Sequence, residues 1–135
     1  MAKKKQITIT LPNKVGELAK IAKKLAQHKV NIEALSVTNL LDVGVVRLIP
    51  SNLKQAKAAL SDLNASLSID DVVAVALQDQ VGALADAAAK LKRAKVNIEY
   101  VYGSTCSDCN CSCNCQAVCI FKTSDLDETD KILAK

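Results

Sequence analysis

Two periods of hydrophobic residues alternate along the chain. Residues 6–11 alternate apolar and polar side chains, which is the period of a strand with one buried face. Leu18, Ile21, Ala22 and Leu25 then recur at the spacing of one helix face. Beyond them the pattern predicts strands at 31–38 and 43–49, a helix at 53–63 and a short closing strand near 65–70.

The same order of elements follows in the second half of the chain. The pattern predicts a strand at 72–77, a helix that buries Leu84, Ala87, Ala88 and Leu91, hairpin strands at 97–102 and 117–121, and a last helix at 125–134. This half has no room for a closing strand. One sheet edge is therefore expected to be open, unless a segment of the first half or another chain covers it.

The two halves are copies of one another. Residues 15–33 and 81–99 are identical at twelve of nineteen positions when they are aligned with an offset of 66. A duplication of this length indicates two copies of one small fold. We therefore place a first domain at 1–70 and a second domain at 71–135.

The order β-α-β-β-α-β is typical of a ferredoxin-like fold. We expect an α+β protein with two ferredoxin-like βαββαβ units, antiparallel sheets and helices on one face, the second unit lacking its last strand. Residues 12–38 and residues 78–103 resemble the ACT domain, a regulatory module that senses small molecules. Residues 42–49 further resemble the hairpin of stand-alone tandem ACT proteins.

The resemblance implies a binding role. Members of this family commonly hold an amino acid at a junction between paired domains, and the loop after the first strand and the start of the second strand grip it. By position, the resemblance assigns this role to Asn13, Val15, Gly16, Asn31 and Ile32 in the first copy, and to Asp79, Val81, Gly82, Asn97 and Ile98 in the second.

Two of these residue types also suit such a ligand on chemical grounds. A glycine in the first helical turn, Gly16 or Gly82, lets a ligand approach closely, and the free amides there suit a carboxylate. Asn31 or Asn97 can donate and accept hydrogen bonds at once. The alternative interpretation is that the glycines permit close helix–strand packing and the asparagines only end a helix.

The copies differ at the first of these positions. Asn13 is expected to cap the first helix, and Asp79 takes its place as cap in the second copy. A carboxylate there would attract an ammonium group and repel a ligand carboxylate. The two sites are therefore expected to differ in ligand, or only one of them functions.

The second copy alone carries a cysteine cluster with the spacing C-x2-C-x-C-x-C-x-C-x3-C. Its members are Cys106, Cys109, Cys111, Cys113, Cys115 and Cys119. Aligning 46–48 with 118–120 gives an offset of 72, so we infer six residues added to the second hairpin, an insertion at about 104–116. This alignment puts Cys119 at the place of Arg47.

Cysteines at this density in a reducing compartment favour a soft metal. Four thiolates suffice for tetrahedral zinc, and copper(I) favours them as well. An iron–sulfur cluster fits less well, because the spacing matches neither ferredoxin pattern. We expect a thiolate-bound metal at the six cysteines, zinc before the others; disulfides or free thiols are the alternative.

Composition excludes several classes of function. The chain has 135 residues, half of them hydrophobic, which is enough for a packed core without disulfides. Its net charge of +4 forms no basic stripe and its aromatic residues are only Phe121, Tyr100 and Tyr102, so we expect no nucleic-acid partner. No signal-peptide pattern and no membrane-spanning apolar run is seen, so we expect a cytoplasmic protein without a membrane partner.

We do not expect an enzyme. His28 is the only histidine, and no Ser/His/Asp set, phosphate loop or convincing carboxylate pair is seen. The leading hypothesis is a small-molecule-binding regulator that holds an amino acid between its two copies and acts through a homodimer mate or a partner enzyme. The second hypothesis is a metal or redox sensor that uses the cysteine hairpin on an ACT scaffold.

Overall fold

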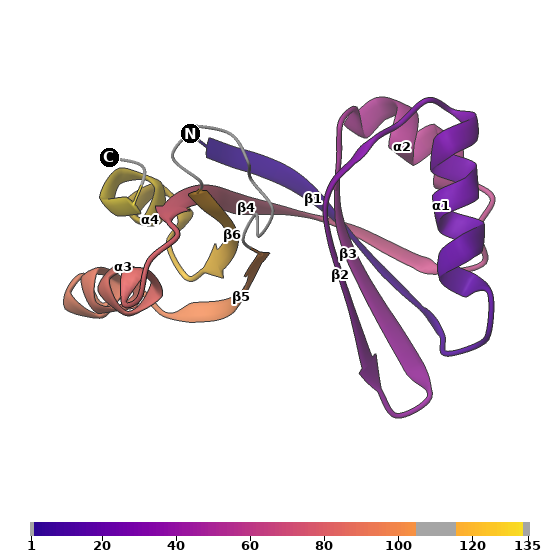
Figure 1. Ribbon diagram of the computed structural model, residues 1–135. Coiled ribbons are helices and arrows are strands. Elements are labelled where there is room, and N and C mark those ends of the chain that lie inside the picture. Colours follow the sequence, from indigo (N-terminus) through magenta and orange to yellow (C-terminus); the bar gives the residue numbers. More distant parts are fainter. Residues whose placement is uncertain (1, 105–115, 134–135) are drawn as a thin grey trace. The chain divides into compact units, whose positions relative to one another are not determined.

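The computed structural model describes residues 2–104 and 116–133 (Figure 1). Its elements are β1 (Ala2–Pro12), α1 (Glu17–Gln27), β2 (Ile32–Leu40), β3 (Val43–Pro50), α2 (Leu53–Leu60), β4 (Ser66–Gln78), α3 (Ala83–Arg93), β5 (Ile98–Ser104), β6 (Gln116–Thr123) and α4 (Leu126–Leu133). The α+β class and the βαββαβ order predicted from the sequence are confirmed.

The chain divides into two compact units. We call residues 5–70 the first unit, and residues 1–4 together with 71–135 the second unit. The strand order is β2-β3-β1-β4 in the first unit and β1-β4-β6-β5 in the second. The start of β1 therefore takes the place beside β4 that the second copy cannot fill from its own residues.

Strand β4 corrects one expectation. The sequence suggested one strand ending near residue 70 and another beginning at 72, but β4 runs without a break. The two aspartates at the expected boundary have partners that keep the strand extended. Thr8 Oγ1 donates to the Asp70 carboxylate at 3.1 Å, and Lys122 Nζ donates to the Asp71 carbonyl at 3.3 Å.

The first unit packs both helices against one face of its strands. Figure 1 shows α1 and α2 on the same side of β2 and β3. The buried cluster joins these helices to β1 and β3, and its members are Ile7, Ile9, Leu11, Ile21, Leu25, Val30, Val46, Leu48, Ala56, Ala59 and Leu60. The alternating residues of β1 and the helical stripe of α1 thus meet in one apolar core.

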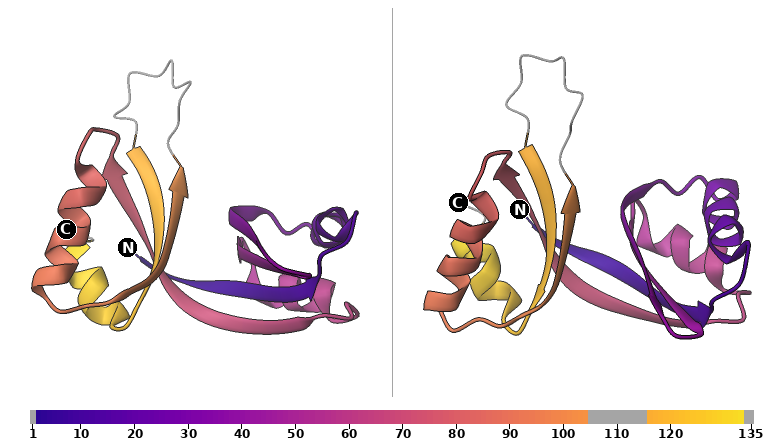
Figure 2. Two further views of the ribbon diagram at one scale, coloured as in Figure 1. Left: turned by 90° about the horizontal axis from the view of Figure 1, so that it is seen from below. Right: turned by 60° about the horizontal axis from the view of Figure 1, so that its bottom comes forward.

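The second unit repeats this arrangement with its own core. Figure 2 shows α3 and α4 on one side of β4, β6 and β5. The buried cluster consists of Val73, Val75, Ala87, Leu91, Val96, Phe121 and Leu133. Of the helical stripe expected in α3, Leu84 is exposed, and it becomes part of the site described below.

The strand registers correct the length of the hairpin insertion. Ile7 pairs with Leu48 in the first unit, and Val73 pairs with Phe121 in the second. Ile7 and Val73 differ by 66 in residue number, whereas their partners Leu48 and Phe121 differ by 73. The second hairpin is therefore longer by seven residues rather than six.

Helix capping supports the same offset. The side chains of Asn52 and Asp125 accept from the backbone amides three residues further on, at 3.0 Å in both units. Their numbers also differ by 73. Cys119 therefore corresponds to Val46, and the expectation that it stands at the place of Arg47 was wrong. This correction moves Cys119 to the face of the sheet that packs against the helices.

The residues expected to cap the first helix of each copy do not do so. Gly16 and Gly82 occupy the cap positions with φ of 89° and 91°, and neither helix start has a side-chain cap bond. A side chain at either glycine would meet no atom within 4 Å. Glycine is thus favoured by the left-handed backbone there, not by a close neighbour.

Candidate functional site

The loop after the first strand of each unit places its polar residue beside a pocket. Asn13 borders a pocket of the first unit, and Asp79 borders the corresponding pocket of the second. Val15 and Val81, assigned to the same site from the sequence, are fully exposed. Gly16 and Gly82 are the cap residues directly before α1 and α3, and no side chain caps the first-turn amides of these helices.

The other predicted positions lie at the opposite end of each unit. Asn13 N donates to Asp42 O at 2.9 Å, beside the turn between β2 and β3. Ile32 pairs with Pro50 at the far end of β3. Seven residue steps along that strand separate the two ends by roughly 23 Å. A single unit therefore does not bring Asn31 and Ile32 together with Asn13.

The start of the second strand has local hydrogen bonds in both units. Asn31 N donates to Ser51 Oγ at 2.9 Å, and Asn97 N donates to Ser124 Oγ at 3.0 Å. Asn97 and Ile98 also border an open surface depression of about 460 Å³ together with two lysines, Lys92 and Lys95. These positions thus form a separate, basic surface of the second unit.

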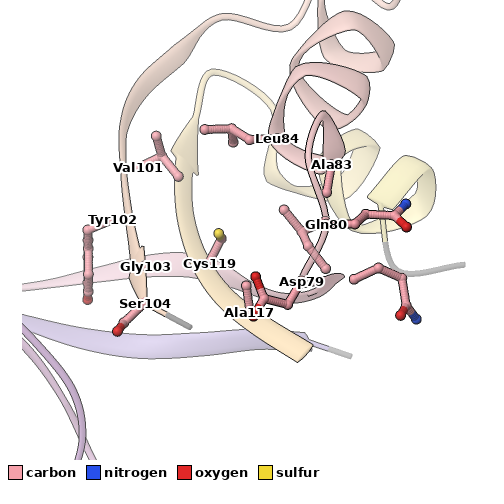
Figure 3. Close-up of a pocket in the computed structure, with 12 residues that line it drawn as sticks. Asp79, Gln80, Ala83, Leu84, Val101, Tyr102, Gly103, Ser104, Ala117 and Cys119 are labelled. Atoms are coloured by element: carbon pink, nitrogen blue, oxygen red, sulfur yellow. The ribbon is translucent and has the colours of Figure 1, made fainter. Parts of the chain in front are cut away.

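The pocket beside Asp79, which we call the second pocket, is enclosed by three elements. It measures about 310 Å³ and lies between β5, β6 and the segment that joins β4 to α3. Figure 3 shows Leu84 of α3 and Val101 of β5 directed toward one another, with Cys119 of β6 below them. Leu77 and Ala117 complete the apolar part of the lining.

The polar part of the second pocket lies on the loop. Among the lining residues that the structure describes, only Asp79 carries a formal charge, and it stands between Gln78 and Gln80. The first turn of α3 contributes Ala83 and Leu84 to the wall. Because the positive end of a helix dipole and its amides are at this turn, the pocket combines a carboxylate with an anion-favouring helix start.

Cys119 forms the floor of the second pocket. It pairs with Gly103 across β5 and β6, and a side chain at Gly103 would lie 2.8 Å from the Cys119 sulfur and 2.6 Å from the Val118 carbonyl oxygen. Glycine at 103 therefore leaves the space that the sulfur uses. Burial raises the pKa of the Cys119 thiol, so the floor is a neutral thiol at physiological pH.

The corresponding pocket of the first unit, the first pocket, is much smaller. It measures about 90 Å³. Val37 and Val46 occupy the positions of Gly103 and Cys119, and Glu17 occupies the position of Ala83. The Glu17 carboxylate lies 3.6 Å from Lys20 Nζ. Larger side chains and a glutamate thus fill the space that the second pocket leaves open.

The predicted metal ligands fall mostly outside the part of the chain that the structure describes. Of the six cysteines, the structure describes only Cys119. The five outside the described residues are Cys106, Cys109, Cys111, Cys113 and Cys115. Among residues 2–104 and 116–133, no three His, Cys, Asp or Glu side chains are grouped so that they could hold a metal. Within the same residues, no helix is long and apolar enough to cross a membrane.

The sequence missed most of the pocket lining. It singled out Asp79 and Cys119, the latter for a different role. Gly103 and Val101 carry a signal that could have found them, because alternation along β5 puts both on the face of Leu77. Ala83 is found only by comparing it with Glu17 across the repeat.

The comparisons with known proteins agree with this architecture. Residues 2–135 match the model of a family described as ACT domain pair. The chain is 31% identical to protein BT0572 from Bacteroides thetaiotaomicron, with a TM-score of 0.85, over 98% of this chain and 88% of that one. No curated protein matches the chain.

More distant structures share the fold. The regulatory subunit of aspartate kinase from Thermus thermophilus is 12% identical with a TM-score of 0.63, over 99% of this chain and 95% of that one. A structure of aspartokinase alpha and beta subunits is 15% identical with a TM-score of 0.61, over 98% of this chain and 95% of that one.

Proposed function

Since the chain belongs to the ACT domain pair family, we propose that it is a non-enzymatic regulatory protein of the cytoplasm that binds an amino acid. The observation that carries this proposal is the second pocket. Its lining combines a carboxylate, Asp79, with the first turn of α3, which no side chain caps, and with an apolar wall. These two features suit the ammonium and the carboxylate of an amino acid.

The size and lining of the pocket are consistent with such a ligand. Small-molecule sites are commonly cavities of about 300–1,000 Å³ with a largely apolar wall and a few polar groups. The second pocket, at about 310 Å³, is at the lower end of this range. The ACT fold also occurs in the regulatory subunit of an aspartate kinase, which agrees with a regulatory rather than a catalytic role.

In this proposal the bound amino acid changes how the protein pairs with a second copy or with a partner enzyme. A ligand shifts such an equilibrium only as far as it binds one state more tightly than the other. The ten positions named from the resemblance remain predictions for that junction. Of these positions, Asp79 lines the second pocket, and Gly82 is the cap residue of the helix whose first turn borders it.

A thermal-shift screen with the twenty amino acids tests the proposal. A ligand at 100 times its dissociation constant stabilises the folded state by about 2.7 kcal/mol, which raises the melting temperature by several degrees. The matched controls are the amine and the acid that lack one of the two charged groups. If no amino acid raises the melting temperature at millimolar concentration, the proposal is wrong.

The second candidate function is a thiolate metal or redox site on the ACT scaffold. It rests on the sequence alone, because all six cysteines fall within fourteen residues. Thiolates at this density suit zinc or copper(I). Metal analysis of the anaerobically purified protein should find a stoichiometric metal whose content falls in a Cys113→Ser variant. Metal-free protein would exclude the metal site and leave only the redox site.

A further inference from the structure

The two pockets occupy equivalent positions, so the repeat offers an internal comparison. Register and sequence offsets relate Asn13 to Asp79 and Glu17 to Ala83. Both pockets lie at the same place between a loop, a helix start and a hairpin. Any difference in what they can bind must therefore come from the side chains.

The first difference is space. At about 90 Å³, the first pocket offers less than a third of the volume of about 310 Å³ in the second. The second pocket gains its volume where Gly103 and Ala83 replace larger residues, and Figure 3 shows these positions on opposite walls.

The second difference is charge. The first pocket is bordered by Lys14 and Glu17, which carry opposite charges, and the Glu17 carboxylate lies at the helix start. It occupies the turn that a ligand carboxylate would use and would repel it. In the second pocket this turn begins with Ala83; its own carboxylate, Asp86, does not border the pocket, and Asp79 is the one charged residue among the described residues that do.

The third difference concerns the walls that a ligand side chain would meet. Leu77, Leu84, Val101 and Ala117 are apolar, and Cys119 lies beside them in the lining. Among residues 2–104 and 116–133, none that lines the floor offers a charge that would pair with a second carboxylate or with a second ammonium group. Burying such a group unpaired is costly.

We propose that only the second pocket is a ligand site, and that it takes an α-amino acid with an uncharged aliphatic side chain. The ammonium group lies at Asp79, the carboxylate lies at the first turn of α3, and the side chain lies against Val101 and Cys119. The first pocket is the unused copy. This inference rests on the proposed function and adds the location, the stoichiometry and the class of amino acid.

Isothermal titration of the full chain tests the stoichiometry and the class. L-valine and L-leucine should bind at one site per chain, at least about tenfold more tightly than L-aspartate and L-lysine. Two equivalent sites, or tighter binding of a charged amino acid, would overturn the inference while leaving amino-acid binding intact. If none of the twenty amino acids binds to the wild-type protein, the inference and the proposed function both fail.

Exchanging residues between the two pockets tests the location. Ala83→Glu gives the second pocket the residue of the first, and should weaken L-valine and L-leucine binding at least about tenfold. The substitution is compatible with folding, because a glutamate already occupies this turn of α1 and favours a helix start. The matched control, Glu17→Ala, should change affinity less than about twofold.

Cys119→Val provides an independent readout of the side-chain subsite. It places the residue of the first pocket on the floor of the second, and should weaken L-leucine binding more than L-alanine binding. Equal losses for both amino acids, or retained binding in Ala83→Glu with loss in Glu17→Ala, would place the ligand elsewhere and overturn the inference.

Discussion

The first and second pockets have the same backbone frame and differ in a few side chains. The first is filled by Val37, Val46 and Glu17, and the second is opened by Gly103, Cys119 and Ala83. The cores beneath them are built alike, from two strands and two helices. A duplicated fold can thus keep its scaffold in both copies while a binding cavity develops in one.

The largest effect is expected at Gly103, where the two pockets differ most. Gly103→Ala would place a methyl group 2.6 Å from the Val118 carbonyl oxygen. Because this oxygen belongs to the backbone of β6, the strands must shift, and the free energy of unfolding should fall by about 1–3 kcal/mol. Urea denaturation followed by circular dichroism measures this loss.

Gly44 provides the matched control for this substitution. It corresponds to Ala117, and a methyl group there would meet its nearest atom, Leu11 Cδ1, at the ordinary distance of 3.6 Å. Gly44→Ala should therefore leave stability nearly unchanged. A Gly103→Ala/Cys119→Ala double variant as stable as the Cys119→Ala single variant would show that the sulfur, not the backbone, is the obstacle.

A buried hydroxyl pair distinguishes the last helix of the second unit from its counterpart. Thr129 Oγ1 donates to Asp125 O and lies 2.7 Å from Thr123 Oγ1, whereas Ala56 occupies the equivalent position in the first unit. Thr129→Val removes both contacts and leaves Thr123 buried with fewer partners. The free energy of unfolding should fall by about 1–2 kcal/mol.

Thr129→Ser separates the hydrogen bond from the packing at this position. It keeps the hydroxyl and loses only a methyl group, so it should be less destabilising than Thr129→Val in the same denaturation experiment. The opposite order would mean that the apolar contacts of the threonine methyl group, not the hydroxyl pair, stabilise the start of α4.

Both units share a strained position after their first helix. Lys29 and Lys95 have φ of 57° and 59°, in the left-handed region that glycine tolerates best. Lys29→Gly and Lys95→Gly should each raise the free energy of unfolding by about 0.5–1 kcal/mol. Lys23→Gly, inside α1, should lower the free energy of unfolding by about 1 kcal/mol, measured by the same urea denaturation. Equal losses at all three positions would contradict this assignment.

The repeat made the fold predictable, and it failed where the copies diverge. The shared segment of each copy fixed the order of elements, because apolar periodicity is a property of the chain itself. The register of the second hairpin was misplaced by one residue. Val118, the neighbour of Cys119, is a valine like Val46, so the two matched equally well in sequence. Only strand pairing showed that Cys119 faces the helices.

The site was harder to predict than the fold. Asp79 was found because the resemblance to the ACT domain assigned that position to the site, but its expected role as a helix cap was wrong: Gly82, in the left-handed region, is the cap residue of α3. Gly103 and Ala83 were missed because they contribute space to the pocket, and neither alternation along β5 nor the repeat shows by itself that this space stays empty. Cavities depend on what neighbouring strands leave empty, which requires their register.

The smallest effect on stability is expected from the titration of Cys119. Its counterpart in the first unit, Val46, has no titratable group. Burial raises the pKa of this thiol above its usual value of 9.0, so the unfolded chain releases the proton at lower pH than the folded chain. The stabilisation by the buried neutral thiol is therefore complete below that value and is lost as the pH rises through the folded pKa. Wild-type stability should fall relative to that of Cys119→Val across this range. Parallel stability curves from pH 7 to pH 10 would mean that the thiol is as accessible to water as in the unfolded chain, and that the second pocket is wetter than its lining indicates.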